Sequence, residues 1–239
     1  MSTLLVNRVG DQATVTLNRP DRANALDREL VESLHGALDD FERASPRFVL
    51  LAAEGRNFCA GFDFSGFEAA TEAELCWRFV RIEQLLQRIA HAPWPVAALV
   101  GGPAYGAGAD LAAACADSSA AAEARFRMPG WKFGLALGTR RLIARAGAAR
   151  AQAFLAAART VGAEEACELG IVRRVHAAGA EAAQVAAMRE AVASLAVGAA
   201  RRLAAISIPD TRAADMASLV ESLTDGDLKA RIRGFRSGT

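Results

Sequence analysis

The stretch VAALVGGPAYGAGADL, residues 96–111, decides the fold class. Its five apolar residues, 96–100, predict a buried strand, and the small residues after them predict a loop that runs directly into an Ala-rich helix. The same order occurs earlier, where the apolar segment 48–53 is followed by the loop 54–66 and by an amphipathic helix over about 72–91. Repeated strand, loop and helix segments predict layered α/β structure with parallel strands.

The rest of the chain extends this pattern in both directions. A turn at Gly10-Asp11 predicts a hairpin. The further expected elements are strands over 4–9, 13–17, 118–122 and 171–175, and a helix that Asp27 caps and that runs to about residue 44. From about residue 139 the chain is nearly all helical. We therefore expect an α/β core over residues 1–178, carrying the site, and a helical region over 179–239 for oligomerisation.

Composition and charge exclude several classes of function. The 239 residues, 52% of them hydrophobic, suffice for one large core, and a formal net charge of +1 does not provide the basic surface that nucleic acid requires. The N-terminal MSTLLVNRVG does not resemble a secretory signal, and the sequence has no apolar run of membrane-spanning length. We expect a cytoplasmic protein that binds neither nucleic acid nor a membrane.

The four cysteines are far apart, form no C-x-x-C pair and are accompanied by only three histidines. A metal site is usually marked by a close cluster of such residues, so the sequence predicts neither a metal ion nor a redox cofactor. The cysteines are expected to be reduced and mostly buried.

The two loops that follow buried strands carry the chemistry. A loop that leaves a strand and opens a helix presents unpaired N–H groups at the positive end of the helix dipole. Two such groups aimed at a thioester oxygen would form an oxyanion hole. For Gly106-Ala107-Gly108, a dinucleotide fingerprint is the rival interpretation, but Asp110 and Leu111 occupy the place of its third glycine. Close helix packing is the alternative for either loop taken alone.

Three ordered motifs resemble those of the enoyl-CoA hydratase/isomerase superfamily, the crotonases. Residues 17–26 resemble the family's opening L-N-R-P motif, residues 57–64 resemble F-C-A-G-x-D-L, and residues 95–111 resemble P-x-x-A-x-x-x-G-x-x-x-G-x-G-x-E-L. The resemblance implies a spiral of β-β-α units followed by a helical region that forms a homotrimer or a dimer of trimers. It also implies an acyl-CoA substrate, whose CoA is no separate cofactor.

The resemblance assigns roles to individual positions. Phe62 and Ala107 match the residues whose backbone N–H groups form the oxyanion hole, although the family usually has glycine at the second position. Residues that match the CoA-binding segments are Arg22, Ala23, Ala25, Ala60, Asp63 and Phe64. Arg22 would contact a CoA phosphate through its guanidinium. Phe67 and Trp131, with Phe62 and Phe64, would line the acyl pocket and favour a bulky or aromatic acyl group, and core packing is the alternative role for each.

The family's two water-handling glutamates are replaced here by Asp110 and Gly130. Loss of one carboxylate makes ordinary hydration doubtful. Asp110 is the candidate for proton transfer, and we expect the dipole of its helix to lower its pKa and favour a carboxylate base. Helix capping is its alternative role. Glu68 and Glu83 are further acidic candidates that the sequence does not place.

The sequence therefore predicts an acyl-CoA enzyme, a lyase or isomerase, that abstracts an α-proton or moves a double bond through an enolate. Two alternatives stay open. One keeps the oxyanion hole for thioester hydrolysis, decarboxylation or aryl-CoA conversion. The other is binding of CoA esters without turnover.

Overall fold

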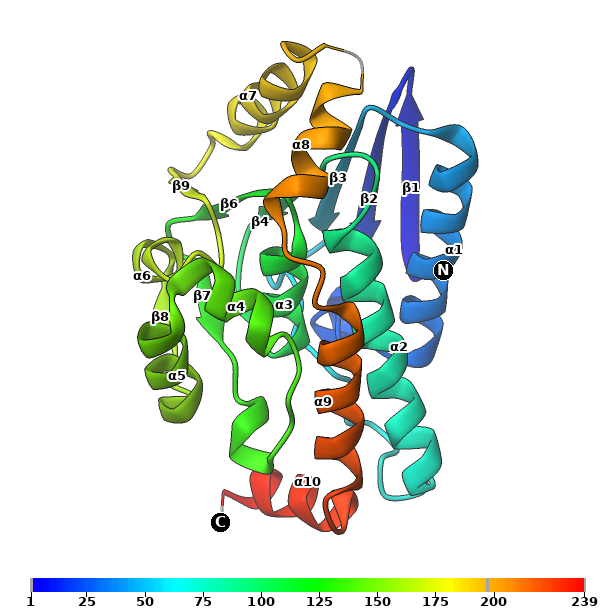
Figure 1. Ribbon diagram of the computed structural model, residues 1–239, viewed down its shortest axis with the longest axis vertical. Coiled ribbons are helices and arrows are strands. Elements are labelled where there is room, and N and C mark those ends of the chain that lie inside the picture. The colour runs from blue at the N-terminus through cyan, green and yellow to red at the C-terminus, as the bar shows by residue number, and fades with distance from the viewer. Residues whose placement is uncertain (1, 197, 239) are drawn as a thin grey trace.

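The computed structural model describes residues 2–196 and 198–238. These residues form two β-sheets with helices packed around them (Figure 1). The larger sheet has the strand order β1-β2-β3-β4-β6-β9, with β1 antiparallel to β2 and every other pair parallel. Its strands are β1 (Leu4–Val9), β2 (Gln12–Leu17), β3 (Phe48–Ala53), β4 (Val96–Val100), β6 (Asp117–Ala121) and β9 (Arg174–His176). The smaller sheet has the order β5-β7-β8, with β5 (Ala104–Tyr105), β7 (Arg125–Arg127) and β8 (Val161–Gly162). The predicted layered α/β class is confirmed.

Helices follow the strands in the predicted order. The helices are α1 (Arg28–Ala44), α2 (Glu72–Ala90), α3 (Ala107–Ala114), α4 (Thr139–Ala146), α5 (Ala148–Ala157), α6 (Ala163–Glu168), α7 (Glu181–Ala193), α8 (Ala199–Ser207), α9 (Arg212–Thr224) and α10 (Leu228–Ser237), with 3-10 turns η1 (Pro20–Arg22) and η2 (Gly130–Phe133). Asp27 caps α1 as predicted, because its Oδ1 accepts from the Leu30 N–H at 2.8 Å. Thr71 and Glu74 form a capping box at the start of α2.

Alternating residues of the central strands face two different layers. Val49, Leu51 and Val96 belong to the main core with α1, α2 and α3, whereas Phe48 and Leu50 pack with Met188 of α7 on the other face. Burial on both faces explains why β3 and β4 are continuous apolar runs.

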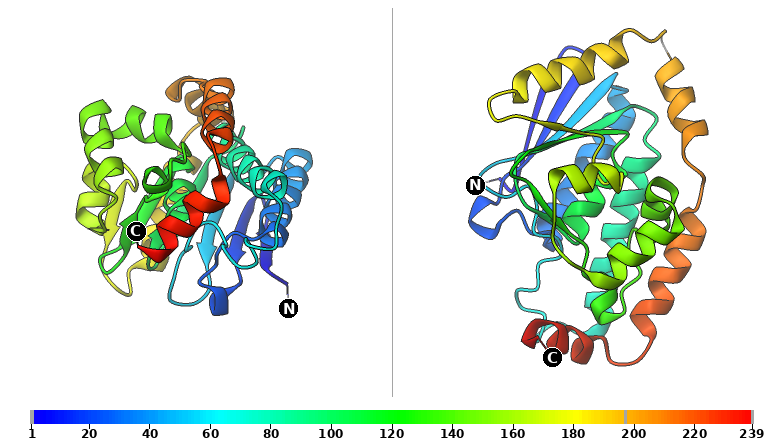
Figure 2. Two further views of the ribbon diagram at one scale, coloured as in Figure 1. Left: turned by 90° about the horizontal axis from the view of Figure 1, so that it is seen from below. Right: turned by 90° about the vertical axis from the view of Figure 1, so that its left-hand side faces the viewer.

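The helical C-terminal region packs back onto the core of its own chain. Figure 2 shows α7 to α10 following one side of the molecule from end to end. Leu219 and Leu223 of α9 and Leu228 and Ile232 of α10 are buried in the main core cluster. None of the helices in residues 2–196 and 198–238 is long and apolar enough to cross a membrane.

Two parts of the fold differ from the sequence-based expectation. The last strand of the large sheet begins at Arg174 and not at Ile171, because Ile171 and Val172 are buried in a turn that follows Gly170. The small sheet was not predicted at all, since its strands are only two or three residues long. This small sheet contributes directly to the site.

Candidate active site

The two loops identified in the sequence are joined by backbone hydrogen bonds. Cys59 of the first loop pairs with Ala104 of the second in a parallel bridge. The Cys59 N–H donates to the Pro103 carbonyl at 3.2 Å, and the Tyr105 N–H donates to the Cys59 carbonyl at 2.8 Å. The structure therefore brings together segments that lie more than forty residues apart in the sequence.

Glycines permit this close approach. A methyl group built on Gly108 would overlap the Cys59 carbonyl oxygen. One built on Gly61 would lie 2.5 Å from the Tyr105 carbonyl oxygen and 3.2 Å from the Ala107 nitrogen, and Gly61 also has a φ of +84°. The Ala107 nitrogen consequently lies beside the residue that precedes Phe62.

The backbone N–H groups of Phe62 and Ala107 are both left without an acceptor in the described part of the chain. Ala107 is the first residue of α3, where a helix provides no partner for the N–H. Phe62 forms a bridge with Leu26, but the hydrogen bonds of that bridge use the Gly61 carbonyl and the Asp63 N–H. The Phe62 N–H therefore faces away from Leu26.

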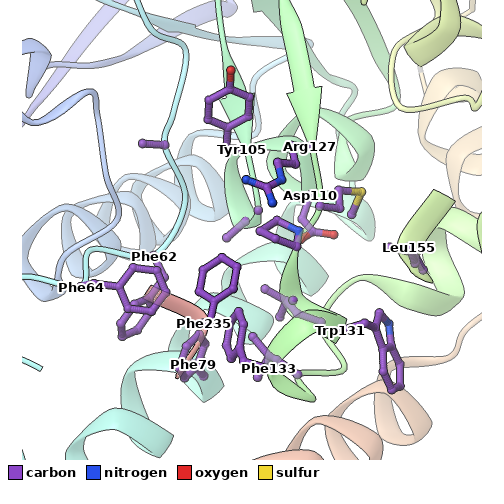
Figure 3. Close-up of a pocket in the computed structure, with 18 of the residues that line it drawn as sticks. Phe62, Phe64, Phe79, Tyr105, Asp110, Arg127, Trp131, Phe133, Leu155 and Phe235 are labelled. Atoms are coloured by element: carbon purple, nitrogen blue, oxygen red, sulfur yellow. The ribbon is translucent and has the colours of Figure 1, made fainter. Parts of the chain in front are cut away.

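Both residues line a cavity of about 310 Å³. One side is aromatic, with Phe62, Phe64 and Phe79 near the first loop and Phe133 and Phe235 from η2 and α10 (Figure 3). Phe62 stacks on Phe79 with ring centroids 4.1 Å apart, and Phe133 lies 5.0 Å from Phe235. Contacts of this kind hold flat side chains in place and give the cavity a rigid apolar side.

Asp110 is the carboxylate on the cavity wall. It lies in the first turn of α3 and is 5% exposed, and its carboxylate forms no hydrogen bond or ion pair with the described residues. Burial raises the pKa of Asp110 to about 8, a rise that nearby Arg141 opposes and Glu83 reinforces. The expectation that the helix dipole would lower this pKa is wrong, because removal from water outweighs the dipole.

Gly138, just before α4, lies in close contact with the Asp110 carboxylate. Any side chain at position 138 would overlap the carboxylate oxygens of Asp110. Behind it, Arg141 of α4 forms a bidentate ion pair with Glu83 of α2, at 2.6 and 2.8 Å. Asp215 of α9 approaches the same arginine at 3.4 Å. Glu83 is therefore paired with an arginine, and it does not line the cavity.

Known proteins resemble this chain over most of its length. The sequence profile of the family described as enoyl-CoA hydratase/isomerase matches residues 10–222. The chain belongs to this family. A "Putative enoyl-CoA hydratase" of Thermus thermophilus is 36% identical over 240 residues, which cover 95% of this chain and 94% of the relative. A "Probable enoyl-CoA hydratase" of Mycobacterium tuberculosis is 38% identical over 165 residues, which span 68% of this chain and 66% of the relative.

Solved structures of family members confirm the predicted crotonase fold. A "putative enoyl-CoA hydratase/isomerase" from Bordetella parapertussis is 41% identical and superposes with a TM-score of 0.95 over 99% of each chain. An enoyl-CoA hydratase/isomerase from Xanthobacter autotrophicus is 27% identical, with a TM-score of 0.84 over 99% of this chain and 93% of the other.

Several residues assigned through the family resemblance come together on the cavity. Ala60, Phe62, Phe64, Ala107 and Asp110 line it. Trp131 lines it as well, although 45% of its surface is exposed, and its Nε1 donates to the Thr139 hydroxyl at 3.1 Å. Gly130, where the second glutamate of the family would stand, also lines the cavity and brings no carboxylate.

Other assigned residues lie outside the cavity in the described part of the chain. Phe67 is buried in the main core, where Arg236 covers its ring, and it does not line this cavity, so its place in an acyl pocket stays a prediction. Arg22 is exposed beside Asp21, so a contact with a CoA phosphate stays a prediction. Ala23 has a left-handed conformation, and its carbonyl accepts from the Ala60 N–H at 2.9 Å. The Ala25 carbonyl accepts a hydrogen bond from Arg19.

The two remaining acidic candidates do not reach the cavity. Asp63 is buried below the first loop, where it accepts from the Ser65 N–H at 2.8 Å and from Arg19 at 3.3 Å. Burial would raise its pKa, but these hydrogen bonds outweigh burial and lower the pKa of Asp63. Glu68 is exposed and pairs with Arg233 at 3.3 Å. Neither residue lines the cavity.

The sequence interpretation missed Arg127 and Phe235, which also line the cavity. Phe235 could have been found, because Leu228, Ile232 and Phe235 follow helical spacing near the end of the chain. Arg127 had no such signal, since its strand has three residues. Among the described residues, no group of three or more His, Cys, Asp or Glu side chains could hold a metal ion.

Proposed function

We propose that this member of the enoyl-CoA hydratase/isomerase family processes acyl-CoA thioesters through an enolate or a related oxyanion. The thioester oxygen would accept hydrogen bonds from the Phe62 and Ala107 N–H groups, and Asp110 would move the proton. One observation carries the proposal: two N–H groups and one buried carboxylate, all without a partner among the described residues, meet on the same cavity. Preorganised donors stabilise developing negative charge most strongly where water is excluded.

The pKa of about 8 suits Asp110 for both directions of proton transfer. A group that titrates near neutral pH can take a proton from carbon and return it to another carbon. Movement of a double bond needs such a group. In this scheme the enolate forms when Asp110 removes the proton α to the thioester or at the vinylogous γ-carbon, and reprotonation gives the isomer.

Hydration of a double bond needs a second group to hold and activate water. Asp110 is the single carboxylate among the described residues that line the cavity, and Gly130 occupies the other family position. We therefore propose isomerase or proton-exchange chemistry as the main activity, with ordinary hydratase activity low.

Deuterium uptake at the α-carbon of CoA esters in heavy water, measured by mass spectrometry, tests the proposal directly. Saturated, unsaturated and aryl esters would be compared, and the aromatic side of the cavity should favour bulky or aryl esters. The wild type should exchange at least one ester, and Asp110→Asn should lower the rate by about 10²- to 10⁴-fold. Below pH 8 the wild-type rate should rise with pH, because the base must be ionised.

Asp117→Asn is the matched control, since Asp117 pairs with Arg174 away from the cavity and its loss should leave exchange unchanged. Tight binding of esters without exchange or turnover would instead establish a binding protein. Exchange that persists in Asp110→Asn would remove Asp110 from the mechanism.

We further propose that the chain forms a homotrimer or a dimer of trimers through its helical C-terminal region. Exposed apolar residues on α8 and α9 support this assembly: Leu203 is 54% exposed, Ile206 82% and Val220 42%. Light scattering coupled to size-exclusion chromatography gives the mass of the assembly, and a monomer would contradict the proposal.

A further inference from the structure

The side of the cavity opposite the aromatic rings is polar, and the small sheet builds it. Tyr105 of β5 and Arg127 of β7 are direct partners in the parallel register, so their side chains stand on the same face. The preceding partners, Ala104 and Phe126, are fully buried on the opposite face. Figure 3 shows Tyr105 and Arg127 away from Phe62 and Phe64, with Asp110 below Arg127.

Among the described residues, one hydrogen bond holds the Arg127 guanidinium. Its Nε donates to the carbonyl of Ala158, the residue after α5, at 2.7 Å. Its two terminal nitrogens have no carboxylate within ion-pair distance and no hydrogen-bond acceptor in the described part of the chain. The guanidinium thus has donors left for a ligand, in a planar arrangement that matches carboxylate or phosphate oxygens.

The charge on this arginine is not balanced inside the cavity. Asp110, the carboxylate on the same cavity wall, is mostly protonated at neutral pH because burial raises its pKa to about 8. The neighbouring Arg125 differs, because its guanidinium donates to three carbonyl oxygens of its own turn and does not line the cavity. Arg127 is exposed, so this cation beside the cavity is open both to water and to an anionic ligand group.

We propose that Arg127, with Tyr105 beside it, forms an anion subsite of this cavity. The subsite takes either the terminal carboxylate of a dicarboxylic acyl group or a phosphate of CoA. This inference rests on the proposed function, because it places a CoA thioester in the cavity. It adds a property that the oxyanion hole and Asp110 do not determine: which anionic part of the substrate is recognised.

Binding measurements by calorimetry separate the two sources of the anion. The probes are butyryl-CoA, glutaryl-CoA and glutaryl-pantetheine, of which the last has no phosphate. Wild type, Arg127→Gln and the control Arg125→Gln would be compared. Loss of one charge-assisted interaction should weaken binding by about tenfold in Arg127→Gln, with no change in Arg125→Gln.

A weakening restricted to the two glutaryl thioesters assigns the subsite to the acyl carboxylate. A weakening of both CoA esters that spares glutaryl-pantetheine assigns it to a CoA phosphate. Arg127→Lys should restore part of the affinity, because it keeps the charge without the planar fork. Equal affinities of wild type and Arg127→Gln for all three probes would overturn the subsite.

Failure of the proposed function gives a different result. If the wild type binds none of the thioesters, the proposed acyl-CoA function is rejected. Binding of free glutarate and of inorganic pyrophosphate then tests the anion subsite. Binding of either anion that Arg127→Gln loses would keep the subsite, and binding of neither would overturn it.

Discussion

The loops 57–66 and 101–110 both follow buried strands and both contribute an N–H group to the cavity, yet they are held in place differently. The first loop is fixed by charged side chains. Arg19 and Ser65 hold the Asp63 carboxylate, while Arg78 donates to the Asp63 carbonyl at 2.5 Å and lies 4.3 Å above the Phe62 ring. Both oxygens of the Asp63 carboxylate in this loop therefore accept hydrogen bonds.

The second loop is fixed by close backbone packing and by the start of a helix. Gly106 and Gly108 allow the tight passage into α3, and the side chain of Asp110, in the first turn of that helix, has no hydrogen-bond partner among the described residues. The pKa of Asp63 is lowered, whereas burial raises the pKa of Asp110 to about 8. The comparison teaches that a paired carboxylate stabilises a loop, and that an unpaired buried one is available for proton transfer.

Gly108→Ala should have the largest effect of any change to the loop backbone, because it breaks the packing between the two loops. The new methyl group would overlap the Cys59 carbonyl oxygen, so the two loops must separate. The Phe62 and Ala107 N–H groups could then no longer donate to the same thioester oxygen. Loss of one oxyanion donor typically lowers rates by about 10²- to 10³-fold. Exchange rates from the deuterium assay, with circular dichroism to confirm folding, measure the effect.

Gly101→Ala is the matched control in the same loop. A methyl group at Gly101 meets no atom within 4 Å, and its φ lies outside the left-handed region. Its exchange rate should equal that of the wild type. Equal losses in both variants would show that the loop tolerates no substitution and that close packing at Gly108 has no special role.

The free energy of unfolding of Asp110→Asn should increasingly exceed that of the wild type as the pH rises. The folded pKa of about 8 lies above the usual value of about 4, so the wild-type fold loses stability as pH rises from about 4 to 8. Asparagine does not ionise, and the stability gain should reach roughly a few kcal/mol near pH 8 and then level off. Urea denaturation at several pH values measures the slope, and a flat difference would contradict a raised pKa.

The large sheet, its helices and the two loops could be predicted from the sequence, because long apolar strands and amphipathic helices have strong periodic patterns. Motif positions also named Phe62, Ala107 and Asp110, which line one cavity in the structure, and their catalytic roles stay a prediction. The sequence could not give the pKa of Asp110, which depends on burial by segments such as Gly138 that are distant in sequence. It also missed Arg127, since strands of two or three residues leave no periodic signal, and it left open whether Phe67 lines a pocket or packs in the core, where the structure has its ring.

Asp63→Asn should show the smallest effect, with the opposite pH dependence. The folded pKa of Asp63 is lowered, so the carboxylate stabilises the fold above the unfolded value of about 4, and this contribution disappears as pH falls through the folded pKa. At neutral pH the variant should lose about 1 kcal/mol, and the difference should shrink below about pH 4. Asp21→Asn is the control, because the exposed pair of Asp21 with Arg22 contributes little. If Asp63→Asn instead abolished deuterium exchange without changing the free energy of unfolding, Asp63 would belong to the chemistry and the distinction between the two loops would fail.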